Sequence, residues 1–93
     1  MIKTFADKRT AALSIERHVK GLPSDVAGWA KRQLDLIDAA ATLAFLRVPP
    51  GNRLEALAGN RIGQHGVRVN DQWRLCFRWR DGNAYDVEFC DYH

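Results

Sequence analysis

The sequence predicts an α+β fold in which an N-terminal strand and two helices pack on one face of an antiparallel sheet. Helical apolar spacing is confined to the first half of the chain, and alternating apolar residues to the second half. A turn-forming cluster, Pro49-Pro50-Gly51-Asn52, separates the halves. Strands that follow helices as a group favour an α+β arrangement. The chain of 93 residues suits a single domain over residues 1–93, because neither half could bury a core alone.

The first half of the chain predicts one strand and two helices. Residues 1–5 alternate in character and suit a short strand. Asp7 is a suitable N-cap for a helix over residues 8–19, and Gly21 is a typical left-handed stop after it. Ser24 is the expected N-cap of the second helix. That helix carries a continuous apolar stripe, which we expect to pack across the sheet: Val26, Ala30, Leu34, Ile37 and Ala41.

The second half of the chain predicts strands and tight turns. Residues 54–57 suit a short strand, and residues 64–79 form a hairpin pattern with a tight turn at Asn70-Asp71. Asp81-Gly82-Asn83 predicts a second hairpin turn, followed by a strand over residues 84–90. Alternation gives the middle strand an apolar face, and the last strand one as well: Trp73, Leu75, Phe77 and Trp79, then Tyr85, Val87 and Phe89. The opposite face of the middle strand is basic: Arg74, Arg78 and Arg80, with Cys76 among them.

Arginine dominates the charge of the second half. The chain has a formal net charge of +3, and from residue 47 to residue 80 there are seven arginines, no lysine and two acids, Glu55 and Asp71. The planar guanidinium group fits phosphate, so this cluster suits a nucleic-acid footprint. A solvated basic sheet edge is the alternative explanation. The arginines are Arg47, Arg53, Arg61, Arg68, Arg74, Arg78 and Arg80.

Several classes of protein do not fit the sequence. No run of ~20 apolar residues suggests a membrane span, and residues 1–5 do not begin a signal peptide. Cys76 and Cys90 lack metal-type spacing, and we favour cytoplasmic thiols over a disulfide. No phosphate-binding loop, dinucleotide-binding turn or zinc motif is present, so we expect a cytoplasmic protein with no metal and no cofactor.

The remaining polar inventory suits RNA cleavage without a metal. That reaction needs a base for the 2′-hydroxyl, an acid for the leaving 5′-oxygen, and cations for the charge that develops on the phosphate. The candidates are His65, Arg68, Arg74 and Arg78, with Asp91, Tyr92 and His93 at the last three positions. A frayed, solvated terminus is the alternative for the last three. Strand alternation also sets Asp91 and His93 on one face and Tyr92 on the other, unless the strand ends or twists first.

These segments resemble the HigB-type toxins of the RelE/ParE superfamily, and the GraT-like branch most closely. The resemblance covers essentially the whole chain. It rests on Arg53-Leu54-Glu55-Ala56-Leu57, on residues 63–77 and on Asp91-Tyr92-His93, and it extends to residues 1–5 and 36–40.

The resemblance implies a RelE-like (microbial RNase-like) fold and a toxin of a type II toxin–antitoxin pair. Such toxins cleave mRNA in the ribosomal A site, and their partner is a helix-turn-helix antitoxin of HigA type, which carries operator DNA binding for the pair. In the family the terminal Asp, Tyr and His belong to the active site, which here implies Asp91, Tyr92 and His93. Arg68 and Arg74 would line the same cleft. Arg53, Arg61, His65 and Arg78 would contact RNA.

Two positions depart from the family pattern. Some members carry a catalytic His where this chain has Glu55, and a carboxylate there is a candidate base that also repels phosphate. The family often has Ser where Gly66 stands. Two rival functions remain: a ParE-like gyrase inhibitor, or a non-catalytic module that binds RNA or a protein partner.

Overall fold

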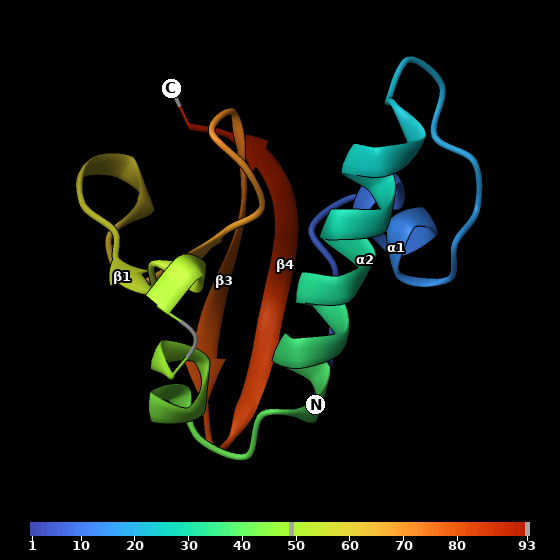
Figure 1. The fold of residues 1–93 in the computed structure, drawn as a ribbon. Coiled ribbons are helices and arrows are strands. Elements are labelled where there is room, and N and C mark those ends of the chain that lie inside the picture. Colours follow the sequence, from blue (N-terminus) through green and yellow to red (C-terminus); the bar gives the residue numbers. More distant parts are fainter. Residues whose placement is uncertain (49, 93) are drawn as a thin grey trace.

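The computed structural model describes residues 1–48 and 50–92 of the chain. Helices α1 (Lys8–Ser14) and α2 (Ser24–Ala39) lie together on one side of a four-stranded antiparallel sheet (Figure 1). The strands follow the order β1 (Glu55–Ala56), β2 (His65–Arg68), β3 (Trp73–Arg80) and β4 (Asn83–Asp91). Short 3₁₀ turns η1 (Leu43–Arg47), η2 (Pro50–Asn52) and η3 (Gly59–Arg61) complete the chain between α2 and β2. The predicted α+β arrangement is confirmed.

The core lies between α2 and one face of the sheet, which we call the inner face. The predicted stripe of α2 is buried from Val26 to Ile37, whereas Ala41 lies beyond the helix and is exposed. Opposite it, β2, β3 and β4 contribute side chains that are at most 1% exposed: Val67, Leu75, Phe77, Ala84, Val87 and Phe89. Burial of this many large apolar side chains is the main term that holds the two layers together.

Helix α1 is shorter than predicted. Asp7 caps its first turn as expected, accepting a 2.7 Å hydrogen bond from the Thr10 N–H. The helix ends at Ser14 rather than near residue 19, because Glu16 adopts a left-handed φ of 59° and the Arg17 N–H closes back onto the Ala12 carbonyl. The second helix also begins one residue away from expectation, with Pro23 at the N-cap position and Ser24 inside the helix.

The N-terminal segment forms two parallel bridges with β4 instead of a continuous strand. Ile2 lies opposite Ala84 and Phe5 opposite Val87. Between these bridges β4 bulges at Asp86, which has a φ of 53° and donates its N–H to the Thr4 hydroxyl oxygen at 2.8 Å. A bulge interrupts regular strand pairing. The predicted first strand is therefore present only as these two contacts.

The same bulge corrects the predicted face of Tyr85. The β3–β4 register shifts between Cys76 and Arg78, so that alternation restarts along β4. Ala84 then occupies the core, and Tyr85 lies on the opposite face, 4.7 Å from the Arg80 guanidinium (ring centroid to Cζ).

Candidate functional site

The sheet face opposite the inner face, called the outer face here, carries the candidate site. Two rows of paired residues run across it, and directly opposed residues share a face. One row is Glu55, Gly66, Cys76 and Glu88. The neighbouring row is Arg68, Arg74 and Cys90.

The hairpin register decides which arginines reach this face. The tight turn predicted at Asn70-Asp71 would pair Arg68 with Trp73. The observed turn is longer: the Asn70 carboxamide oxygen accepts hydrogen bonds from the N–H groups of Gln72 and Trp73, and β2 and β3 pair Arg68 with Arg74. A slip of one residue moves a whole strand to the other face. The longer turn is therefore the reason that Arg68 and Arg74 lie together.

Arg74 is the centre of the site. Its side chain is 15% exposed, its guanidinium lies 5.3 Å from the Tyr92 ring centroid, and its Nη1 lies 3.6 Å from a Glu55 carboxylate oxygen. The buried Nε atom has no hydrogen-bond partner among the described residues. Tyr92 is held in place by its N–H, which donates to the Gln72 carbonyl at 2.9 Å. A buried guanidinium donor without an acceptor suits an incoming phosphate oxygen.

The pKa of Tyr92 depends on burial and on the charged side chains around the site. Burial raises the pKa of its phenol, and the Glu55 carboxylate raises it further, while the guanidinium groups of Arg68, Arg74 and Arg53 act in the opposite direction. The phenol is therefore a neutral hydrogen-bond donor near pH 7. An open hollow of about 550 Å³ lies beside Arg74 and Glu55, with Asn60 and Arg61 on its wall.

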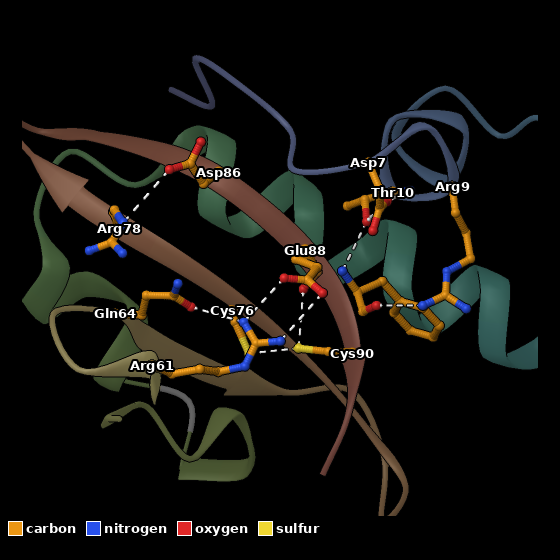
Figure 2. A network of polar contacts seen from close by, with 11 residues as sticks. Asp7, Arg9, Thr10, Arg61, Gln64, Cys76, Arg78, Asp86, Glu88 and Cys90 are labelled. Carbon is orange, nitrogen blue, oxygen red and sulfur yellow. Dashed lines mark hydrogen bonds and ion pairs between the residues drawn. The ribbon is translucent and has the colours of Figure 1, made fainter. Parts of the chain in front are cut away.

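The four predicted RNA-binding residues lie in different places. Arg53 is exposed and close enough to influence Tyr92. Arg61 makes two contacts with the Glu88 carboxylate, at 3.1 and 3.3 Å, and Arg78 lies 3.7 Å from Asp86 on the same face (Figure 2). His65 lies on the inner face, opposite Phe77 and 6.4 Å from its ring. His65 is therefore on the wrong face to join Arg74 and Tyr92, and Arg61 is already ion-paired.

Asp91 and Tyr92 keep the alternation of β4. The strand extends through Asp91, which lies opposite Trp73 on the inner side, while Tyr92 reaches Arg74. Asp91 and Tyr92 therefore approach the end of the sheet from different faces. His93 lies outside the described residues. The structure brings together Glu55, Arg68, Arg74 and Tyr92. Asp91 precedes Tyr92 in the chain but lies on the inner side of the sheet.

Sequence reasoning did not assign a role to the small apolar cluster beneath these charges. Leu57, Cys76 and Cys90 are buried together on the outer face. Gly66 permits this closure, because a Cβ atom there would lie 3.3 Å from Leu57 and 3.6 Å from Arg74. Two features of the sequence pointed to this cluster. Cys76 shares its strand parity with Arg74, and Gly66 stands where the family often has Ser.

Comparisons with known proteins agree with this fold. A family model described as RelE-like toxin of type II toxin–antitoxin system HigB matches residues 3–93. Toxin HigB-1 of Vibrio cholerae is 46% identical over 66 residues, which cover 71% of this chain and 70% of the relative. Endoribonuclease HigB of Proteus vulgaris is 30% identical over 93 residues, covering all of both chains.

Solved structures with low sequence identity share the same architecture. YafQ from E. coli superposes with a TM-score of 0.62 at 14% identity, covering 99% of this chain and 94% of that one. The YoeB–YefM complex from Staphylococcus aureus gives 0.62 at 18% identity, covering 100% and 98%.

The fold and the matched family model thus define a RelE-like toxin. The chain belongs to the HigB-like family of type II toxin–antitoxin systems, whose toxins are paired with an antitoxin. Its closer likeness to the GraT-like branch stays a prediction. Within residues 1–48 and 50–92, the helices are too short or too polar to cross a membrane.

Proposed function

We propose that the chain is an endoribonuclease toxin that cleaves mRNA on the translating ribosome. The observation that carries this proposal is the Arg74 guanidinium, which is largely buried, stacked on Tyr92 and left with an unpaired Nε donor among the described residues. A phosphate bound there would meet a second cation at Arg68, whose present ion-pair partner is the fully exposed Asp71. The full-length relative named Endoribonuclease HigB supports the same activity.

The proposed chemistry is an internal attack on phosphorus. The RNA 2′-oxygen forms a bond to phosphorus, its proton passes to Glu55, and the 5′-oxygen leaves with a proton from His93. Arg74 and Arg68 stabilise the negative charge that develops on the phosphate oxygens. Tyr92, kept neutral by its raised pKa, donates a hydrogen bond or stacks on a base. Asp91 is assigned a positioning role at the end of β4.

The ribosome and an antitoxin are the proposed partners. So small and open a site gives little binding energy of its own, so the ribosome would hold the mRNA in the reactive orientation. The arginine-rich outer face would meet ribosomal RNA, with Arg53, Arg61 and Arg78 as contacts, and this binding would weaken steeply with salt. A helix-turn-helix antitoxin of HigA type would neutralise the toxin in the cytoplasm, and operator DNA would be bound only through that antitoxin.

The decisive experiment is cleavage of mRNA on programmed ribosomes, mapped by primer extension. Wild type, Arg74→Ala and His93→Ala are compared with Arg17→Ala, a control arginine in the loop after α1. We expect A-site cuts with wild type and the control, and none with the other two. Purified mRNA without ribosomes should remain intact.

A wild-type protein that cuts no mRNA on ribosomes contradicts the proposal. Gyrase inhibition assayed in parallel would then indicate a ParE-like activity. Ribosome binding without cleavage would indicate a non-catalytic module.

A further inference from the structure

The two cysteines of the chain are in direct contact on the outer face. Cys76 pairs with Glu88 across β3 and β4, and Cys90 pairs with Arg74, so the cysteines are diagonal neighbours. Their sulfur atoms lie 2.7 Å apart in a hydrogen-bonded contact (Figure 2). Neither cysteine forms a disulfide in the structure. The mechanism proposed above uses neither of them.

The cysteine pair is enclosed but lies close to the surface. Cys76 is fully buried and Cys90 is 7% exposed. Leu57 covers them from the side of the hollow, and Arg61 covers them through its ion pair with Glu88. Both covering residues belong to the segment between β1 and β2, and both side chains of the ion pair remain partly exposed. Movement of this segment would admit a small oxidant.

We propose that Cys76 and Cys90 are a redox modification site, where a peroxide converts the thiol pair into a reversible disulfide in the folded protein. A disulfide needs sulfur atoms about 2.05 Å apart and neighbouring backbones that already face each other. Cys76 and Cys90 lie on paired strands, two positions apart along the ladder, and their sulfur atoms are already 2.7 Å apart, so only a short movement separates them from bonding distance. Disulfides in a reducing compartment are typically transient, which fits a reversible bond.

The setting favours one reactive thiolate. A hydrogen bond from the Cys76 thiol lowers the pKa of Cys90 to about 7, and the guanidinium group of Arg61 acts in the same direction. The pKa of Cys76 is raised, first by the hydrogen bond to Cys90 and then by burial. Cys90 is also the more exposed of the two. It is therefore the sulfur that reacts first.

The reaction balances with hydrogen peroxide as the oxidant. The Cys90 thiolate attacks one peroxide oxygen, the O–O bond breaks, and hydroxide leaves, giving a sulfenic acid on Cys90. The Cys76 sulfur then attacks Cys90, the S–O bond breaks, and the second hydroxide leaves. The proton of Cys76 and one from solvent convert the two hydroxides into water. Two thiols are oxidised and one peroxide is reduced.

The bond would tie together the two strands that carry the candidate site. Cys90 lies opposite Arg74 and two residues before Tyr92, so the disulfide joins β3 to β4 next to the Arg74–Tyr92 contact. The inference goes beyond the proposed nuclease function and does not depend on it, because its test needs no RNA.

The test is peroxide treatment of the folded wild-type protein, followed by alkylation in denaturant and mass spectrometry. We expect a loss of about 2 Da, no alkylation, and a peptide pair linking Cys76 to Cys90. The reaction should be about tenfold faster near pH 8 than near pH 6, because the thiolate of Cys90 is the reacting form. The melting temperature should rise by about 5 °C or more, and a dithiol reductant should reverse all of these changes.

Matched variants test whether oxidation depends on the Cys76–Cys90 contact or is general oxidation of thiols. Leu57→Ala should speed the reaction by opening the cover. Cys76→Ser should leave a sulfenic acid on Cys90 that a carbon nucleophile traps. A wild-type protein whose two thiols are both alkylated after peroxide, or which forms the bond only in denaturant, overturns the proposal.

Discussion

The two faces of the sheet are made by alternate residues of the same strands, yet they are built for different tasks. On the inner face Leu75 and Phe77 are completely buried under α2. On the outer face, Arg74, the residue directly before Leu75, contacts Tyr92 and Glu55, and α1 and α2 lie on the other side of the sheet (Figure 1). The comparison teaches that strand parity separates the core from the candidate site. Substitution of one β3 residue is expected to affect stability, and substitution of the next residue is expected to affect the candidate site.

The largest effect is expected on the inner face. Phe77→Ala should lower the free energy of unfolding by about 3–5 kcal/mol, because it removes a buried ring and leaves a cavity. Urea unfolding followed by circular dichroism measures this loss. The neighbouring Arg78→Ala, on the half-exposed side, should change stability by about 1 kcal/mol or less. Equal losses from both variants would break the comparison.

The next largest effect is expected at Arg74. Arg74→Ala should reduce cleavage on ribosomes by about 10²–10³-fold, since it removes the main donor to the developing charge. Arg74→Lys should recover only part of the activity, because an ammonium lacks the planar fork. Both variants should keep the wild-type circular dichroism spectrum. Full activity of the alanine variant would remove Arg74 from the site.

Glu55 should give a smaller change. Glu55→Gln should lower the cleavage rate on ribosomes by about 10²-fold if the carboxylate takes the 2′ proton. Its side chain is half exposed, so stability should barely change. A rate that rises in Glu55→Gln would show instead that the carboxylate only repels phosphate.

The smallest effect concerns the ionisation of Tyr92. Because the folded state raises the pKa of this phenol, its contribution to stability is fully present below about pH 10 and is lost as the pH rises through the raised value. An ultraviolet titration of phenolate absorbance, with Tyr92→Phe as the reference, measures the difference. A phenol that ionises below its ordinary value would contradict the burial described for this ring.

The sequence was sufficient wherever a pattern acts locally. Asp7 caps its helix, Asp81-Gly82 turns the second hairpin, and the apolar stripe of α2 covers the sheet as predicted. The early end of α1 was missed, because Glu16 takes a left-handed conformation usually reserved for glycine. Tyr85 was misplaced, because the bulge at Asp86 depends on a tertiary contact with Thr4.

The candidate site was predictable in membership more than in geometry. Arg68, Arg74, Glu55 and Tyr92 were all singled out, and they lie together. His65 lies apart from this group, on the inner face, because its face follows from a hairpin register that the turn residues alone did not fix. The sequence shows the strand parity of the two cysteines. It does not show the β3–β4 register that makes them diagonal neighbours in contact.

The pairing of the N-terminal segment with β4 has a consequence for when this toxin can fold. Thr4 and Asp86 are separated by 82 positions, so their contact cannot form during synthesis until all of the residues between them have been translated. Contacts between such distant residues close late and slowly. The edge of the sheet that leads to Tyr92 is therefore completed only after both helices and the β2–β3 hairpin have been translated. The order of translation therefore delays the moment at which this toxin can reach its folded state.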